Sequence, residues 1–268
     1  PDGRRAGLVL VHGGGWVTGD RMQLDPVAKM LGRAGYVCFC AEYRLGAEAK
    51  WPAMLHDCKA AVRWMRANAA RLGVSPDHIG ALGNSAGGHL SLMLGGVDGP
   101  SYPELEGGGG HPDVSSKVAA CCAVYPVTTV ASELLRSLIT NVVMPRDATG
   151  RDLRLFCPVS HASSSFPPTC LIHGNSDELV PVSCSFDMYE ALHSKGAHVE
   201  LHINALAPHG FDMDPPLGRQ TIDIERVFFD RIFRAEKQLF PIDPSRRPGS
   251  ARMPTDALGS IAPGRSKI

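Results

Sequence analysis

Short apolar segments rich in strand-forming residues alternate with segments of helical periodicity along most of the chain. The strand-like segments are residues 7–11, 36–42, 79–82, 118–125, 169–173 and 199–203. The helical patterns are residues 26–34, 54–72, 87–94, 185–194 and 221–238. Helices that separate successive strands are typical of a mostly parallel sheet covered by helices. The sequence therefore predicts a single α/β domain over residues 1–240.

Four segments interrupt this alternation. Residues 75–77, Ser-Pro-Asp, are typical of a turn before the strand at 79–82. Residues 95–111 are rich in glycine and proline and predict a flexible loop. Residues 131–165 combine a short helical pattern with polar turns, so we expect a small lid over a binding site. The Pro- and Arg-rich residues 241–268 lack periodicity and predict a disordered tail.

The balance of charge excludes partners that are recognised by bulk charge. Lys and Arg number 27, and Asp and Glu also number 27, so the chain has no net field for nucleic acid or an anionic membrane surface. The longest apolar run, residues 118–127, is far shorter than the about 20 residues that span a bilayer. The sequence thus predicts no nucleic-acid binding and no membrane span, and it leaves the oligomeric state open.

The eight cysteines indicate free thiols and no disulfide framework. Those in apolar, strand-like runs are Cys38, Cys40, Cys121, Cys122 and Cys170. We expect these five to behave as small buried hydrophobes. No C-x-x-C pair or His/Cys ligand spacing is present, so the sequence predicts no metal site. Reduced thiols favour the cytoplasm, but the chain begins at Pro1 rather than Met, which leaves the compartment and any upstream residues open.

The sequence Gly-Asn-Ser-Ala-Gly at residues 83–87 lies between an apolar strand and a segment of small residues with a helical pattern. G-x-S-x-G in a strand–turn–helix context is the pattern of a nucleophile elbow, a sharp turn that exposes a serine hydroxyl. Gly83 and Gly87 suit such a turn because side chains there would collide with the neighbouring strand and helix. The alternative is that Ser85 only caps a glycine-rich helix. The strand before it favours the nucleophile.

Three consecutive glycines follow the first apolar strand, within the sequence His-Gly-Gly-Gly-Trp at residues 12–16. Glycines leave backbone N–H groups uncovered, so the loop can donate hydrogen bonds to a developing oxyanion. We assign the donors to the amides of Gly14, Gly15 and Ala86, with Gly13 as the nearest substitute. A phosphate-binding loop is the alternative, but the G-x-G-x-x-G spacing and the Walker lysine are absent. Gly13 and Trp16 are expected to line the substrate pocket, although Trp16 also fits a core aromatic.

A carboxylate and a histidine follow the last two predicted strands, in the chain order that a Ser…Asp…His triad requires. Asp177 comes shortly after the strand at 169–173, and Glu178 and Asp187 are its competitors for the acid. The alternative role for Asp177 is a loop or helix-capping residue.

His209 comes shortly after the strand at 199–203, whereas His198 and His202 fall within the strand pattern. Groups at the carboxyl ends of parallel strands gather at one edge of a sheet. We therefore predict that Ser85 is the nucleophile, His209 the general base and Asp177 the residue that orients it.

These motifs resemble those of bacterial esterases and lipases related to hormone-sensitive lipase, in the branch that resembles feruloyl and acetyl-xylan esterases. The resemblance covers residues 7–236. Its motifs are His12–Trp16, Tyr43–Leu45, Trp51–Ala53, Ser75–Gly80, the Gly-Asn-Ser-Ala-Gly-Gly elbow at 83–88, His173–Pro181 and Pro208–Phe211. It implies an α/β-hydrolase fold and hydrolysis of short-chain acyl esters, small molecules, without a metal or organic cofactor. Such enzymes usually carry further strands upstream, so N-terminal strands are expected to be missing or shortened here.

Three functions remain open from the sequence. The leading one is a serine carboxylesterase for acetyl or aryl esters that works through an acyl-enzyme intermediate. A second keeps the triad but cleaves an amide, as an arylformamidase, an amidase or a serine peptidase. The third is a non-catalytic protein with the hydrolase fold, which the complete Ser85, Asp177 and His209 set disfavours.

Overall fold

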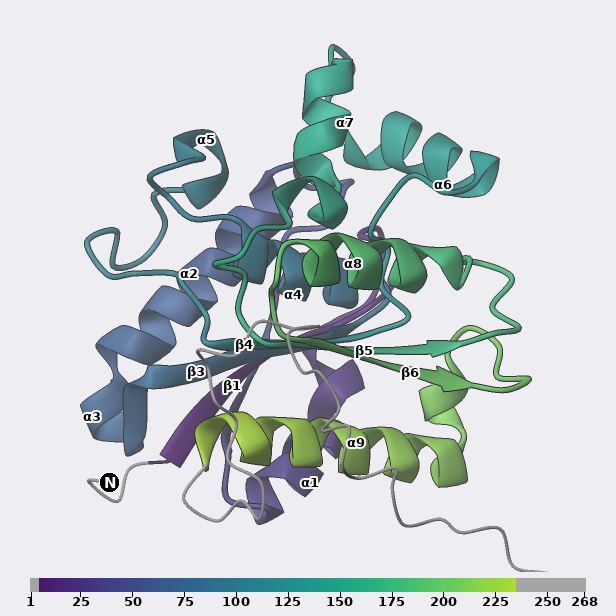
Figure 1. The fold of residues 1–268 in the computed structure, drawn as a ribbon. Coiled ribbons are helices and arrows are strands. Elements are labelled where there is room, and N and C mark those ends of the chain that lie inside the picture. The colour runs from purple at the N-terminus through teal and green to yellow at the C-terminus, as the bar shows by residue number, and fades with distance from the viewer. Residues whose placement is uncertain (1–4, 235–268) are drawn as a thin grey trace, which may run out of the picture.

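In the computed structural model, which describes residues 5–234, six strands form one parallel sheet (Figure 1). Their order across the sheet is β2-β1-β3-β4-β5-β6, and each neighbouring pair is parallel. The strands are β1 (Arg5–Val11), β2 (Val37–Ala41), β3 (Val74–Asn84), β4 (Ala120–Val124), β5 (Thr169–Gly174) and β6 (Val199–Asn204). This architecture confirms the predicted α/β fold.

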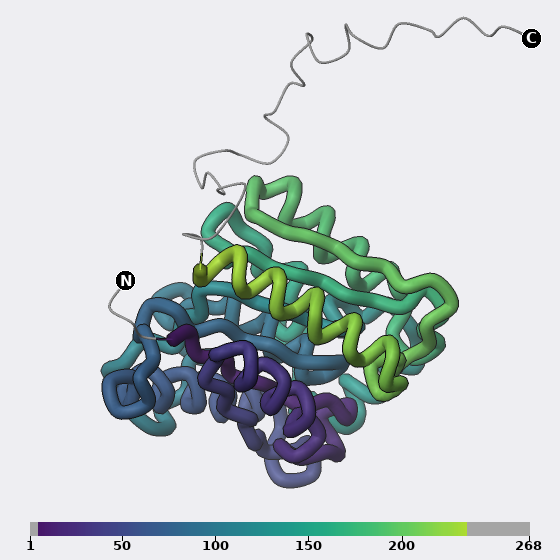
Figure 2. The backbone as a smooth tube through the Cα atoms, turned by 90° about the horizontal axis from the view of Figure 1, so that it is seen from below, coloured from purple at the N-terminus to yellow at the C-terminus, as the bar shows by residue number. Residues whose placement is uncertain are grey.

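Helices cover both faces of the sheet (Figures 1 and 2). On one face lie α1 (Asp25–Arg33) and α9 (Pro215–Phe233). On the other lie α2 (Ala53–Ala67), α3 (Ala69–Leu72), α4 (Ala86–Gly96) and α8 (Ser183–Ser194). None of the helices in the described part of the chain is long and apolar enough to cross a membrane.

The continuous apolar run of β1 follows from this double cover. Val9 and Val11 belong to the core beneath α2, α4 and α8, whereas Leu8 and Leu10 belong to the core beneath α1 and α9. All four side chains are inaccessible to solvent. A strand that is buried on both faces needs apolar residues at every position, which is why β1 lacks polar alternation.

Two predicted boundaries were wrong. The Ser-Pro-Asp segment at 75–77 is not a turn before the strand but part of β3, where the pairing with β1 shifts: Arg5 pairs with Val74, and Gly7 pairs with Ile79. A bulge absorbs the extra residues, and it tolerates a proline that has no N–H to donate. The predicted helix at 54–72 is interrupted at Asn68, whose side-chain amide donates to the Trp64 carbonyl.

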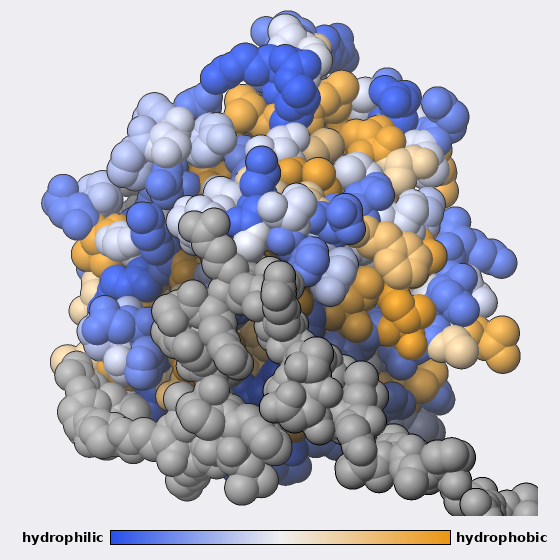
Figure 3. All heavy atoms as spheres, in the orientation of Figure 1, coloured by the Kyte–Doolittle hydropathy of each residue, from blue (hydrophilic) through white to orange (hydrophobic). Residues whose placement is uncertain are grey.

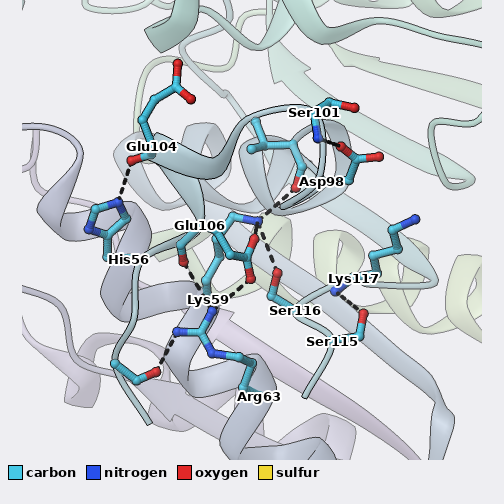
Figure 4. Close-up of polar contacts among 12 residues, drawn as sticks. His56, Lys59, Arg63, Asp98, Ser101, Glu104, Glu106, Ser115, Ser116 and Lys117 are labelled. Atoms are coloured by element: carbon cyan, nitrogen blue, oxygen red, sulfur yellow. Dashed lines mark hydrogen bonds and ion pairs between the residues drawn. The ribbon is translucent and has the colours of Figure 1, made fainter. Parts of the chain in front are cut away.

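The glycine-rich residues 95–111 are held to α2, which corrects the prediction of a flexible loop (Figure 4). They contain the end of α4 and the short helix α5 (Pro103–Glu106). The Glu106 carboxylate lies 2.7 Å from Lys59 Nζ and 2.9 Å from Arg63 Nη1, and both basic side chains are fully buried. Lys59 also donates to the Val97 carbonyl, and Arg63 donates to loop carbonyls. The prediction rested on glycine content, which carries no information on the hydrogen bonds that the buried Lys59 and Arg63 side chains make with this segment.

The predicted lid at 131–165 contains α6 (Glu133–Leu138), the π-helical turn Ile139–Val143, α7 (Gly150–Phe156) and the 3-10 turn Pro158–His161. Figure 1 places α6 and α7 outside the layer formed by α2, α4 and α8. The short helices Arg21–Leu24 and Phe211–Met213 complete the described elements. Movement of the lid stays a prediction, and the predicted tail at 241–268 lies outside the described residues.

Glu106→Ala is expected to lower the free energy of unfolding by about 3 kcal/mol, because it leaves Lys59 and Arg63 buried without a counter-charge. Urea denaturation followed by circular dichroism measures this loss. Glu104→Ala is the matched control on the same short helix, because the Glu104 side chain is 41% exposed in its pair with Arg151. An exposed ion pair adds little stability, so the control should keep the wild-type midpoint. Equal midpoints for all three proteins would contradict the prediction.

Candidate active site

Ser85 occupies a strained turn between β3 and α4. Its φ is +54° and its ψ is −119°, a backbone conformation that non-glycine residues rarely adopt. Two glycines permit the turn. A Cβ added to Gly87 would lie 1.9 Å from the Val11 carbonyl oxygen, and a Cβ added to Gly83 would lie 2.5 Å from the backbone of Gly87. The elbow and β1 therefore approach each other too closely for any side chain at these positions.

The predicted nucleophile, base and acid meet at the carboxyl end of the sheet. His209 Nε2 lies 3.0 Å from Ser85 Oγ, and His209 Nδ1 lies 2.7 Å from Asp177 Oδ2. With the proton on Nδ1, His209 donates to the carboxylate and accepts from the serine hydroxyl. This arrangement can remove the proton of Ser85 as its oxygen attacks a carbonyl carbon.

The Asp177 carboxylate is fixed on both oxygens. Its Oδ1 accepts from the amides of Leu179 and Val180, at 2.9 and 2.8 Å. His173 Nε2 lies 3.2 Å from Oδ2, and the side chains of His173 and Asp177 are both fully buried. Burial raises the pKa of Asp177, but hydrogen bonds from His173, His209 and the Val180 amide outweigh it and hold the pKa well below its usual range. Asp177 is thus ionised wherever His209 can act as a base.

Of the three carboxylates considered from the sequence, the structure places only Asp177 against His209. Glu178 and Asp187 are both exposed, and neither contacts His209 in the described part of the chain. The sequence lacked the signal for His173, which lies at the end of β5 and is buried against the acid.

The glycine loop after β1 turns sharply beside the serine. Gly14 and Gly15 have φ values of +109° and +60°, and a Cβ added to Gly14 would lie 2.1 Å from the Thr18 carbonyl oxygen. A Cβ on Gly13 would lie 3.5 Å from Ser85 Cβ, so the loop passes directly by the nucleophile. Neither the Gly14 nor the Gly15 amide donates a hydrogen bond within residues 5–234. Together with the Ala86 amide at the start of α4, these N–H groups can receive a developing negative charge.

Trp16 is anchored in the core behind this loop and also borders the cavity. Its side chain is 1% exposed, and its Nε1 donates to His89 Nδ1 at 3.3 Å. The other nitrogen of His89 lies 2.7 Å from the Phe156 carbonyl oxygen. Burial lowers the pKa of His89 to about 3, which keeps the ring neutral and able to accept from Trp16. The sequence interpretation missed His89, which lies within the apolar helix α4.

Two further polar residues, Tyr125 and Asp212, lie near His209. Tyr125, at the end of β4, donates to Asp212 and accepts from the Asn84 side chain at 3.1 Å. Its ring lies 4.5 Å from that of His209. Burial raises the pKa of Asp212 and of Tyr125. The sequence interpretation missed this group also, although Asp212 follows His209 by only three residues.

A cavity of about 930 Å³ opens onto Ser85 and His209. Most of its wall is apolar and comes from three parts of the chain. Near α1 and α9 it is lined by Val27, Met30, Pro215 and Ile222, near α6 by Leu134, Leu135 and Leu138, and beside Asp177 by Leu179 and Val180. Gly13 and Trp16, the two predicted substrate-binding residues, also border it.

Comparisons with known proteins match the chain to one protein family and to several esterases. The profile of the BD-FAE family matches residues 3–192. The chain is 30% identical over 247 residues to Esterase LipC of Mycobacterium tuberculosis, covering 86% of this chain and 59% of LipC. It is 32% identical over 182 residues to the probable carboxylic ester hydrolase LipM of the same organism, covering 65% of this chain and 42% of LipM. The chain thus spans about half the length of the curated relatives it matches.

Solved structures show the same likeness. The thermophilic esterase Est2 of Thermogutta terrifontis with bound propionate superposes with a TM-score of 0.75 and 30% identity, over 87% of this chain and 85% of Est2. The same esterase phosphonylated by sarin superposes with a TM-score of 0.76 and 28% identity, over 87% of this chain and 86% of that one.

Asp177→Asn is expected to slow the reaction of Ser85 with a fluorophosphonate by up to about 10⁴-fold, because the amide no longer favours the tautomer that accepts from the serine. Mass spectrometry of the labelled peptide over time measures the rate. Asp187→Asn is the control, since this exposed carboxylate is distant from His209 in the hydrogen-bond network. Labelling of the Asp177 variant at the wild-type rate would contradict the prediction.

Proposed function

The chain belongs to the BD-FAE family, and from this premise we propose that it is a serine carboxylesterase that hydrolyses small esters with short acyl groups. One observation carries the proposal. Ser85, His209 and Asp177 form a continuous chain of hydrogen bonds at the floor of an apolar cavity. That chain supplies a nucleophile, a base for its proton and a buried anion for the resulting imidazolium.

The reaction begins when Ser85 Oγ attacks the ester carbonyl carbon and passes its proton to His209 Nε2. The carbonyl oxygen becomes an anion, which the amides of Gly14, Gly15 and Ala86 stabilise. His209 then protonates the leaving alcohol, and the acyl group stays on Ser85. Water, deprotonated by His209, attacks the acyl-enzyme and releases the acid. Asp177 stays ionised throughout and stabilises the imidazolium in both halves.

The cavity supports apolar substrates. Leucine, methionine and valine side chains dominate its walls, and such walls bind alkyl or aryl groups better than the hydroxyl-rich groups of a sugar. Structures of the related esterase Est2 contain bound propionate or butyrate, which are short acids. We therefore propose acetyl to butyryl esters of apolar alcohols as the substrate class, with Gly13 and Trp16 beside the acyl group.

Ser85→Ala is expected to lower kcat on p-nitrophenyl acetate and butyrate by at least about 10⁴-fold, because no acyl-enzyme can form. Initial rates for acyl chains from acetyl to palmitoyl measure both the loss and the acyl preference. Ser183→Ala, at the exposed start of α8, is the control and should keep the wild-type rate. Equal turnover by the Ser85 variant would overturn the proposed nucleophile. Faster release of acetate from acetylated xylan oligosaccharides than from p-nitrophenyl acetate would overturn the proposed alcohol class.

A further inference from the structure

Three side chains with metal-binding atoms meet on the α9 face of the sheet, away from the catalytic serine. Cys170 lies on β5, and Glu200 and His202 lie on the neighbouring strand β6. Cys170 pairs directly with Glu200, and residues two apart on a strand point to the same face, so all three side chains gather there. The Cys170 sulfur, a Glu200 carboxylate oxygen and a His202 nitrogen all lie within 4.8 Å of one another.

We propose that Cys170, Glu200 and His202 bind one divalent transition-metal ion, with Zn²⁺ as the ion that this set of ligands suits. Thiolate, imidazole and carboxylate are the three protein ligands that Zn²⁺ accepts, and a tetrahedral ion would keep its fourth position for water. The sequence analysis predicted no metal site, because these ligands come from two strands about 30 residues apart and follow no metal-binding spacing.

The cluster is partly buried in the protein and partly open to solvent. Cys170 is fully buried, whereas the side chains of Glu200 and His202 are 26% and 40% exposed on the strand that ends the sheet. The two carboxylate oxygens of Glu200 contact different residues. Oε1 lies 3.1 Å from His202 Nε2, and Oε2 pairs with Arg231 of α9. The carboxylate is therefore oriented through Oε2 while Oε1 faces His202, as supporting residues orient ligands in known metal sites.

The three side chains already interact with one another. Hydrogen bonds to Cys170 and Glu200 raise the pKa of His202 to about 10. Burial raises the pKa of the Cys170 thiol, but hydrogen bonds with Cys122 and His202 lower it below its usual value. A metal ion would compete with these hydrogen bonds for the same ligand atoms.

Besides Cys122 of β4, two groups of α9, Arg231 and Glu225, face the cluster. The Arg231 guanidinium opposes a cation, but the Cys170 thiolate and the Glu200 carboxylate together bring two negative charges. Glu225 of α9 is buried, and its Oε2 has no hydrogen-bond partner among residues 5–234. Burial raises the pKa of Glu225 well above its usual value and so favours the uncharged form of this carboxyl.

An ion at this place would join the two strands that carry the acid and the base. β5 leads directly into the loop of Asp177, and β6 leads into the loop of His209. A metal bridge between them would hold these strands in register at the end of the sheet. Because the ion would bind the folded chain and not the unfolded one, it would raise the Tm.

Titration of the reduced, metal-free full chain with Co²⁺ tests the proposal. We expect one Co²⁺ per chain and a thiolate-to-cobalt charge-transfer absorption, together with a rise in Tm. His202→Val removes a ligand at a partly exposed strand position where valine suits the backbone. It should weaken binding at least about 100-fold, beyond the loss caused by disturbing a supporting residue. Cys170→Ser should abolish the charge-transfer absorption.

Matched controls separate the site from other thiols and imidazoles. Cys121→Ser changes a buried cysteine of β4 that belongs to the core on the opposite face, and His198→Val changes a histidine just before β6. Both should bind Co²⁺ as the wild type does. Absence of a thiolate band in the wild-type chain at millimolar Co²⁺ would overturn the proposal, and so would equal affinity in the His202 variant. Neither readout depends on ester hydrolysis.

Discussion

The close approach of the elbow to β1 is the constraint on which the rest of the site depends. The Val11 carbonyl lies where a side chain of Gly87 would be, so β1, β3 and α4 form one tightly packed unit around Ser85. The glycine loop leaves this unit from the end of β1, which puts its amides beside the nucleophile without any long connection. A single steric requirement thus places the Ser85 hydroxyl and the proposed oxyanion donors together.

The acid and the base depend on a different interaction, a buried anion with its hydrogen bonds complete. Asp177 receives two backbone amides besides the imidazole, and these donors hold the carboxylate in place before any substrate arrives. Such pre-organisation lowers the cost of forming an imidazolium, because no dipoles need to turn during the reaction. The Tyr125 ring packs against the imidazole of His209 and is itself held by its hydrogen bond to Asp212, which restricts rotation of His209 away from Ser85.

The sequence was sufficient for the parts of the molecule that repeat or that need special backbone shapes. Strand–helix alternation predicted the sheet, and the glycines around Ser85 indicated a turn that the structure contains. It failed where distant residues meet. His89 and Asp212 gained their roles from partners that lie far along the chain, and local pattern carries no information on such contacts. His173 lies only four residues from Asp177, yet no pattern in the sequence indicated that contact. The Lys59–Glu106 pair was hidden for the same reason, since a buried lysine looks in sequence like any exposed one.

The contact of Trp16 with His89 and Phe156 has a consequence for substitutions in the segment at 131–165. Phe156 belongs to α7 in the segment at 131–165, and its carbonyl orients the ring that holds Trp16 behind the glycine loop. Leu134, Leu135 and Leu138 of α6, in the same segment, line the cavity, and Leu135 is also part of the buried core. A substitution of the exposed Leu134 would therefore reshape the cavity wall with little effect on the core, whereas a substitution of His89 would remove the hydrogen-bond partner of Trp16. The segment at 131–165 thus contributes both to the cavity wall and to the support of the glycine loop.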